Sequence, residues 1–259
     1  MNPEIWNQIQ TICQRLSTVT YENLTKIIRL ESTGSSTAAQ HLDDSWQNDV
    51  DSWMGGGTCF SMTWHLYQVF MDMGLKPRLV MGHKRKEKNI HCALILPDSE
   101  GLFSGPQEYL FDPGYLIFDP LQMPSPPPFG TGDAFFPLVP NCVKLVRKSM
   151  EQMELWTGGA GSPMKLRFEY PVAGVSPQEF KEHWNESFYR EMMTYPVLNR
   201  LDRERGIQYY YQKGNLVTRD KNGSKMVKIE KEKQVSTLSE VFGIHPEIIE
   251  KALKVLEKP

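Results

Sequence analysis

The apolar pattern of the chain changes near residue 75, from the spacing of amphipathic helices to the short runs of β-strands. Apolar residues first recur at intervals of three and four, which predicts helices over Pro3–Leu16, Tyr21–Leu30, Thr37–Trp53 and Thr58–Met73. Short strand-type segments then follow, at Arg78–Met81, Cys92–Leu96, Tyr109–Phe111, Val143–Val146 and Leu166–Tyr170. Helices first and antiparallel strands afterwards favour an α+β fold.

The last third of the chain mixes both kinds of element. Its pattern predicts a helix over Pro177–Met193, strands at Gln208–Tyr211 and Met226–Ile229, and a pair of helices at the C-terminus. The proline-rich segment Pro124–Gly132 fits neither a helix nor a central strand, so we expect an irregular loop. We therefore predict three subdomains: a helical one over residues 1–82, a strand-rich one over 83–175 and a mixed one over 176–259.

Composition and charge exclude several classes of protein. With 259 residues, 40% of them hydrophobic and 23% charged, the chain has the composition of a folded domain with a sizeable core. Its 29 Lys and Arg against 31 Asp and Glu give a net charge of -2, without the positive field of a nucleic-acid binder. No apolar run approaches the ~18 residues that cross a bilayer. The first twenty residues lack the apolar stretch of a signal peptide, so we expect a cytoplasmic protein without a membrane partner.

Metal and nucleotide sites have no support in the sequence. The four cysteines are scattered, which predicts free thiols in a reducing compartment rather than a disulfide framework. There is no C-x-x-C, H-E-x-x-H or Walker A motif, so we expect no metal. The glycine-rich segment at residues 158–161 opens no predicted helix, and we interpret it as a turn rather than a dinucleotide site.

Cys59 differs from the other cysteines in its setting. It follows Gly55-Gly56-Gly57 and opens the most amphipathic predicted helix of the chain. The positive end of a helix dipole stabilises a thiolate, and the free backbone N–H groups there offer a site for an oxyanion. These features predict a nucleophile. The alternative is a structural cysteine on the apolar face of the helix.

A nucleophilic cysteine needs a base, and the base needs a group to orient it. His91 begins the strand-type run HCALIL, and Asp112 ends the run YLFD before Pro113-Gly114. Two adjacent strands could therefore place an imidazole and a carboxylate beside Cys59. We predict a Cys59–His91–Asp112 triad, and we expect the remaining histidines to be solvated or structural.

These motifs resemble those of the arylamine N-acetyltransferase family, and the resemblance extends over nearly the whole chain. Three family signatures, Pro-Phe-Glu-Asn-Leu, Arg-Gly-Gly-x-Cys and Asp-x-Gly-Phe, are similar to Tyr21–Leu24, Gly56–Cys59 and Asp112–Tyr115. His91 begins an apolar strand, as the catalytic histidine of the family does. The resemblance implies an N-terminal helical bundle, a central antiparallel β-barrel and a C-terminal α/β lid.

The resemblance also implies a reaction. Cys59 would accept an acetyl group from acetyl-CoA as co-substrate, with His91 activating the thiol and Asp112 holding the imidazole. The acyl group would then pass to the nitrogen of an arylamine or hydrazine, in a ping-pong sequence.

Four further residues are expected to bind the substrate. Tyr115 matches the aromatic residue that lines the acceptor pocket in the family. We expect Phe129, Gly130 and Thr131 to lie near it. The basic segment His83–Lys88 could meet the phosphates of coenzyme A or of a phosphopantetheine arm, or it could be a solvated loop.

The chain departs from the family around the nucleophile, because Gly55, Ser61 and Thr63 stand where the family has Arg, Glu and Asn. Because Arg and Glu carry opposite charges, the absence of both leaves no unpaired charge at these positions. Two other functions remain open. The same triad could serve an amide synthase or a transglutaminase-like hydrolase acting on a carrier-bound or peptide acyl group. The fold could also serve a binding protein without turnover.

Overall fold

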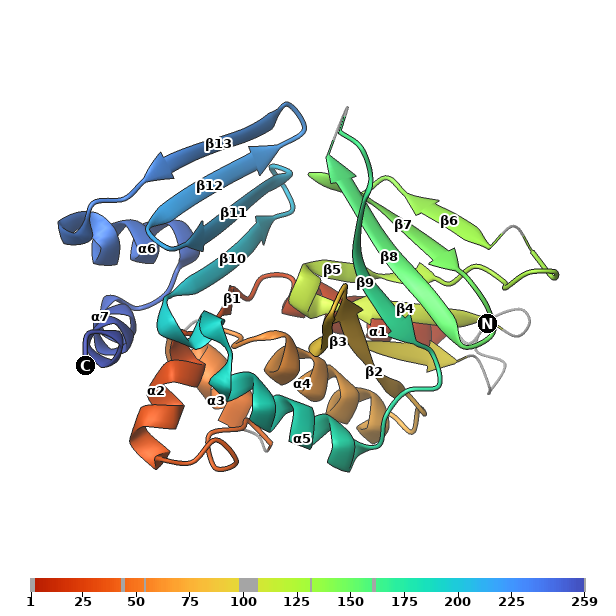
Figure 1. The fold of residues 1–259 in the computed structure, drawn as a ribbon, viewed down its shortest axis with the longest axis horizontal. Coiled ribbons are helices and arrows are strands. Elements are labelled where there is room, and N and C mark those ends of the chain that lie inside the picture. The colour runs from red at the N-terminus through yellow and green to blue at the C-terminus, as the bar shows by residue number, and fades with distance from the viewer. Residues whose placement is uncertain are drawn as a thin grey trace.

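Two antiparallel sheets organise the structure, a computed structural model that describes residues 3–42, 45–53, 55–97, 107–130, 132–159 and 162–258. Figure 1 shows the two sheets on opposite sides of the view, with helices of the N-terminal third and α5 below and between them. The described helices are α1 (Pro3–Leu16), α2 (Leu24–Thr33), α3 (Ser45–Trp53), α4 (Cys59–Asp72), α5 (Pro177–Glu186), α6 (Gln234–Phe242) and α7 (Pro246–Leu256). None of these described helices is both long and apolar enough to span a bilayer.

The larger sheet has eight strands in the order β5-β4-β3-β2-β9-β8-β7-β6, and its curvature makes it barrel-like (Figure 1). The strands are β2 (Arg78–Lys84), β3 (Glu87–Pro97), β4 (Glu108–Asp112), β5 (Ile117–Gln122), β6 (Asp133–Phe136), β7 (Asn141–Arg147), β8 (Gln152–Gly159) and β9 (Lys165–Pro171). A 3₁₀ turn, η1 (Pro113–Tyr115), connects β4 to β5. The predicted α+β class with a barrel-like sheet is confirmed.

The smaller sheet has the order β1-β10-β11-β12-β13 and joins the two ends of the chain. Its strands are β1 (Tyr21–Glu22), β10 (Val197–Asp202), β11 (Ile207–Gln212), β12 (Asn215–Asp220) and β13 (Gly223–Lys228). Tyr21 and Glu22 pair with Asn199 and Leu198 of β10. The N-terminal segment that precedes Cys59 is thus fixed to the C-terminal sheet.

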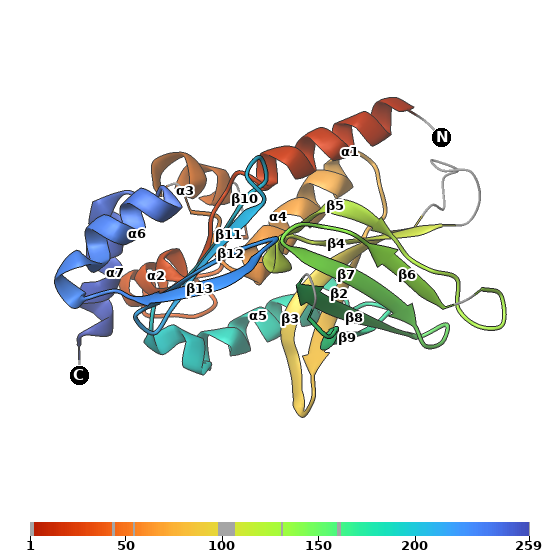
Figure 2. The same ribbon diagram turned by 90° about the horizontal axis from the view of Figure 1, so that it is seen from above.

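Helix α4 lies between the two sheets because its apolar residues recur around much of its circumference. Met62, Leu66 and Phe70 are each at most 1% exposed, and α4 packs against β2, β3 and η1. Phe60 stacks on Trp184 of α5 with ring centroids 6.1 Å apart. Figure 2 shows α4 with α1 on one side and α5 on the other. Such close burial fixes the N-terminal end of α4 beside β3 and η1.

Three of the predicted helices are clearly shorter than expected. The one predicted over Pro177–Met193 ends at Glu186 and is followed by two 3₁₀ turns. Tyr21 and Glu22 form β1 instead of starting a helix, because their partners in β10 are distant in sequence. Helix α3 starts at Ser45 rather than at Thr37. The backbone before it is held by Arg29, whose guanidinium donates to the carbonyl oxygens of Ala39 and Gln40 at 3.0 and 3.3 Å.

The basic segment His83–Lys88 is part of a hairpin and not a loop, since β2 continues to Lys84 and β3 begins at Glu87. Arg85 in the tight turn between them has φ 54. The division into three subdomains stays a prediction; β2 spans its first border at residue 82, and the second, at residue 175, lies between β9 and α5.

Candidate active site

The candidate nucleophile is the first residue of α4. Thr58 is the N-cap, and Gly57 before it has φ +69, a conformation that glycine adopts without strain. A Cβ at Gly57 would also lie 2.2 Å from Oγ of Ser61. The glycine is therefore required for the chain to enter α4 with Cys59 at its N-terminus, where the thiol side chain is 6% exposed.

His91 and Asp112 lie beside Cys59, so the structure brings the three residues of the predicted triad together. His91 Nε2 and Asp112 Oδ1 are 2.7 Å apart, and the His91 side chain is hydrogen-bonded to Cys59. Because Nε2 faces the carboxylate, Nδ1 is the ring nitrogen left for the thiol. This is the arrangement that a nucleophile, a base and an orienting carboxylate need.

Asp112 is completely buried and accepts two further hydrogen bonds. The backbone N–H of Tyr115 donates to Oδ1 at 3.0 Å, and the hydroxyl of Tyr170 donates to Oδ2 at 2.7 Å. His91 is itself stacked on Phe168, with ring centroids 4.1 Å apart. The carboxylate and the imidazole are thus each held in one orientation by β9 and η1.

The electrostatics of the site favour a charged pair. A hydrogen bond from Cys92 lowers the pKa of Cys59 well below its ordinary value, burial opposes this, and the hydrogen bond and charge of His91 add to the lowering. Burial tends to lower the pKa of His91, but the charge and hydrogen bond of Asp112, together with those of Cys59, raise it to about 10. Both shifts favour a thiolate on Cys59 beside an imidazolium on His91.

Alkylation should reveal this thiolate. At about pH 6.5, iodoacetamide is expected to modify Cys59 at least about tenfold faster than any other cysteine, because the lowered pKa leaves the thiolate populated there. Burial raises the pKa of Cys13 to about 12, and that of Cys92 is also raised. Peptide mass mapping over a pH series measures the order. In His91→Ala the labelling of Cys59 should move toward alkaline pH; equal labelling of all four thiols would contradict the assignment.

Gly114 closes the site from the side of η1. A Cβ built on Gly114 would lie 2.3 Å from Cβ of Cys59, 2.7 Å from its Cα and 3.2 Å from Cε1 of His91. These distances leave no room for a side chain. The glycine between Asp112 and Tyr115 is therefore needed for the backbone of η1 to lie against the nucleophile.

Gly114→Ala is expected to lower the free energy of unfolding by about 3 kcal/mol, since overpacking a buried site forces the backbone apart. Thermal and urea unfolding measure the loss, and alkylation of Cys59 at neutral pH should slow as the triad separates. Gly159→Ala is the matched control, because the nearest atom to its Cβ is Oγ of Ser162 at 4.0 Å. Equal stability of the two variants would show that η1 does not pack closely against Cys59.

Glu22 braces the glycine segment before the nucleophile. Its buried carboxylate accepts hydrogen bonds from the backbone N–H of Gly57 at 2.8 Å and of Thr25 at 2.7 Å. A Cβ at Gly55 would lie 2.7 Å from Cγ of Glu22, so the carboxylate arm occupies the space beside that glycine. Trp46 donates from its indole N–H to the carbonyl oxygen of Gly56 at 2.8 Å. The segment is thereby held on both sides.

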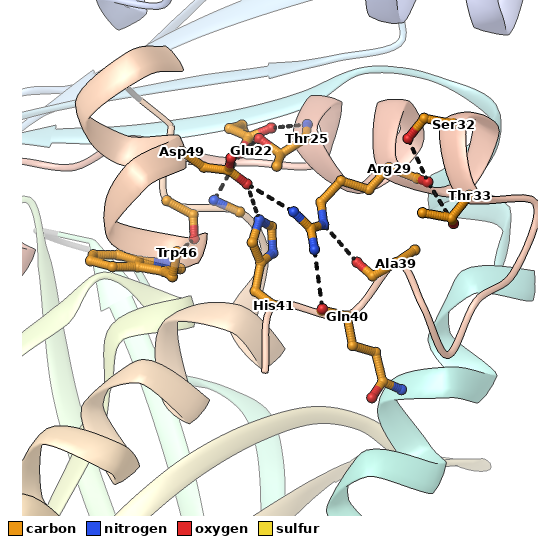
Figure 3. Close-up of polar contacts among 12 residues, drawn as sticks. Glu22, Thr25, Arg29, Ser32, Thr33, Ala39, Gln40, His41, Trp46 and Asp49 are labelled. Atoms are coloured by element: carbon orange, nitrogen blue, oxygen red, sulfur yellow. Dashed lines mark hydrogen bonds and ion pairs between the residues drawn. The ribbon is translucent and has the colours of Figure 1, made fainter. Parts of the chain in front are cut away.

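A second group of polar side chains lies next to this brace. Figure 3 shows Arg29 and His41 both pointing toward the carboxylate of Asp49, near Glu22 and Thr25. His41 is 4% exposed and bonded to Asp49 through Nε2. His41 was expected to be solvated or structural, and it is a structural residue. Its positive charge, when protonated, partly offsets the effect of burial, which raises the pKa of Glu22.

The predicted substrate-binding residues are not all together. Tyr115 lies on η1, with its ring 6.1 Å from that of His91, and it lines a cavity of about 240 Å³ between β5, the segment before β7 and the smaller sheet. Phe129 and Gly130 lie in the loop between β5 and β6, where Phe129 is 80% exposed. Thr131 lies outside the described residues.

Several residues of the site were not predicted from the sequence. Tyr170 and Phe168 belong to a strand that was predicted, but nothing local marks them as partners of Asp112 and His91. Lys26 is 4% exposed, and burial lowers its pKa to about 7; its charge also acts on Cys59. Cys92 was not distinguished from Cys13 and Cys142, yet its hydrogen bond lowers the pKa of Cys59.

No family model and no curated protein matches the sequence. Solved structures do match. The arylamine N-acetyltransferase from Mycobacterium abscessus superposes with a TM-score of 0.74 at 14% identity, over 98% of this chain and 89% of that one. The chain has the arylamine N-acetyltransferase fold. The Nocardia farcinica arylamine N-acetyltransferase gives a TM-score of 0.73 at 16% identity, over 96% and 88% of the two chains.

A third arylamine N-acetyltransferase, that of Mycobacterium marinum in complex with CoA, has a TM-score of 0.71 at 16% identity, over 96% of this chain and 93% of that one. The resemblance stated from the sequence motifs is therefore confirmed at the level of the fold. Because a fold can host several reactions, the chemistry of this chain has to be argued from its own site.

Proposed function

We propose that this chain is an acyltransferase that moves an acetyl or related acyl group from acyl-CoA to an amine nitrogen through a thioester on Cys59. The observation that carries the proposal is the continuous chain of contacts from Cys59 through His91 to the buried carboxylate of Asp112. The fold shared with arylamine N-acetyltransferases supports this choice among thiol reactions.

In the first half-reaction the thiolate of Cys59 attacks the thioester carbonyl of the donor. The free backbone N–H groups at the start of α4 lie where they can stabilise the negative charge that develops on the carbonyl oxygen. The bond to the coenzyme A sulfur then breaks, and the imidazolium of His91 can supply its proton to the leaving thiolate.

In the second half-reaction an amine attacks the acyl group on Cys59. The neutral imidazole left by the first step accepts the proton of the amine, and Cys59 leaves as a thiolate, which restores the resting pair. Asp112 keeps Nε2 occupied throughout, so that Nδ1 stays directed at the reacting atoms. Tyr115 is proposed to contact the acceptor, because it lies against His91.

The cavity beside Tyr115 is the proposed approach for the donor. Its wall includes Thr157, which accepts a hydrogen bond from Arg167 at 2.7 Å, and Arg203, which pairs with Asp119 at 2.8 Å. Guanidinium groups suit the phosphates of coenzyme A. The Mycobacterium marinum structure in complex with CoA supports this class of donor. Phe129 and Gly130, which are exposed, remain candidates for substrate contact, together with Thr131.

Intact-protein mass spectrometry after mixing with acetyl-CoA, without an acceptor, tests the proposal. We expect a gain of one acetyl group that maps to the peptide of Cys59 and is absent in Cys59→Ala. p-Nitrophenyl acetate serves as a second donor, because it carries no coenzyme A. An adduct from the ester but not from acetyl-CoA would support Cys59 as the nucleophile and exclude acetyl-CoA as the donor. An adduct from neither would contradict both assignments.

The acceptor is tested on the acetylated protein. We expect an arylamine or a hydrazine to remove the acetyl group much faster than buffer does, with the amide as product. Rapid loss of the acetyl group to water, unaffected by added amines, would favour the hydrolase instead. A peptide or carrier-bound thioester that acylates Cys59 where acetyl-CoA does not would favour the amide synthase.

A further inference from the structure

Two thiols meet at the candidate active site. Cys59 opens α4, and Cys92 lies in the middle of β3, the strand against which α4 packs. Both are free and buried, at 6% and 0% exposed, and they belong to the same core cluster. The two side chains are joined by a hydrogen bond. In the proposed acyl transfer Cys92 neither bonds to the acyl group nor transfers a proton, although its hydrogen bond lowers the pKa of Cys59.

The packing of α4 on β3 keeps the two sulfur atoms together. Thr63, one helical turn after Cys59, has its hydroxyl 3.5 Å from the carbonyl oxygen of Cys92 and also contacts the Cys92 thiol. On the other side, Gly114 lies against Cys59. Cys92 is paired with Met81 of β2 in the interior of the eight-stranded sheet, so its position is fixed by the sheet.

Cys92 and His91 flank the nucleophile from opposite faces of β3. Consecutive residues of a strand point to opposite sides, and here His91 extends toward Phe168 and Asp112 while Cys92 faces the core that contains α4. Cys59 contacts both because it lies at the end of the helix rather than along it. The site thus holds a reactive thiolate, a base and a second thiol within contact.

We propose that Cys92 is the resolving thiol of Cys59: on exposure to a peroxide, the two cysteines form an intramolecular disulfide that protects the nucleophile from irreversible oxidation. A low-pKa thiolate oxidises first to a sulfenic acid, and further oxidation to sulfinic and sulfonic acids is not reversed by ordinary reductants. A thiol already in contact intercepts the sulfenic acid before that happens.

The oxidant is hydrogen peroxide, and each step balances. The thiolate of Cys59 attacks one peroxide oxygen, the O–O bond breaks, and the hydroxide released takes the proton of the His91 imidazolium to become water. The sulfur of Cys92 then attacks the sulfenic sulfur of Cys59. The S–O bond breaks, and the second hydroxide takes the proton of Cys92 and leaves as water. Two thiols and one peroxide give one disulfide and two waters.

The test needs no acyl substrate, so it is independent of the proposed function. The full-length protein is treated with hydrogen peroxide, residual thiols are blocked with iodoacetamide, and the digest is mapped without reduction. We expect a peptide that links Cys59 to Cys92, and we expect dithiothreitol to restore rapid alkylation of Cys59. In Cys92→Ser and Cys92→Ala, recoverable Cys59 should fall at least about tenfold, with sulfinic and sulfonic acids in its place.

Cys142→Ser is the matched control, because Cys142 lies in β7 and its loss leaves the pair intact. Thermal melting of both Cys92 variants checks that the core survives. If the variants do not fold, the peptide map of the oxidised wild type alone tests the proposal. Three results for Cys59 in the wild type would overturn the proposal. They are oxidation only to sulfinic or sulfonic acid, a disulfide with Cys13 or Cys142, and no reaction with peroxide. Equal recovery of Cys59 in the wild type and in Cys92→Ala would also overturn it.

Discussion

Cys59→Ala is expected to lower the rate of acyl transfer by about 10⁶-fold, the loss typical of removing a nucleophile that acts together with its base. The structure indicates that the loss would be chemical rather than structural. Alanine keeps the Cβ against which Gly114 packs, and only the sulfur is removed from a residue that is 6% exposed. His91 and Asp112 keep their bond at 2.7 Å without it.

The measurement is the rate of acceptor acetylation under saturating donor, with thermal melting to show an intact fold. Cys142→Ala is the matched control, because it removes a thiol from β7 and should leave the rate unchanged. Cys92→Ala should lower the rate near neutral pH and recover at higher pH, since the hydrogen bond from Cys92 contributes to the lowered pKa of Cys59. Residual activity in Cys59→Ala above about one part in a thousand would mean that another group accepts the acyl chain.

The sequence predicted the elements that depend on local pattern. Helix α4 could be predicted, and Cys59 proposed as a nucleophile, because glycines, a capping position and an amphipathic run adjoin one another in the chain. His91 and Asp112 could be proposed because each stands at a marked position of a strand-type run. The geometry among them could not be derived from spacing, since it depends on the register of β2, β3 and β4.

The missed features all depend on partners distant in sequence. Tyr21 and Glu22 become a strand because of β10, which lies about two thirds of the chain length further on. Glu22 becomes the brace of the glycine segment only once that strand is placed beside Gly55 and Gly57. Cys92 follows His91 directly, and alternation along a strand puts their side chains on opposite faces. The sequence does not reveal that Cys59, at the end of a helix, interacts with both.

The same long-range packing explains how the chain manages without the Arg and Glu that the family has around the cysteine. Gly55 leaves room for the Glu22 side chain, whose carboxylate accepts a hydrogen bond from the backbone N–H of Gly57 at 2.8 Å. Ser61 donates to the carbonyl oxygen of Thr58 at 3.1 Å, and its Oγ takes up the space that a Cβ at Gly57 would need. The nucleophile segment is held by backbone contacts instead of a charged pair.

Asp112→Asn is expected to lower the rate of acyl transfer by about 10³-fold near neutral pH, through loss of charge rather than of geometry. Oδ1 of Asp112 accepts both His91 Nε2–H and the backbone N–H of Tyr115. A backbone N–H can only donate, so the amide oxygen of an asparagine takes the position of Oδ1 and still accepts from Nε2–H of His91. The tautomer of His91 is therefore unchanged. The amide nitrogen then faces Tyr170, whose hydroxyl can rotate to accept.

The lost charge should appear in the pH profile. Without the carboxylate, burial lowers the pKa of His91 from about 10, so the ring is neutral near pH 7 and no longer stabilises the thiolate. The pKa of Cys59 then rises toward its ordinary value, and the rate deficit should narrow as pH increases through about 9. Tyr170→Phe keeps the charge and should leave the profile in place, and Asp72→Asn, at the exposed far end of α4, is the surface control. An Asp112→Asn enzyme with the wild-type profile would mean that the charge of His91 comes from another group.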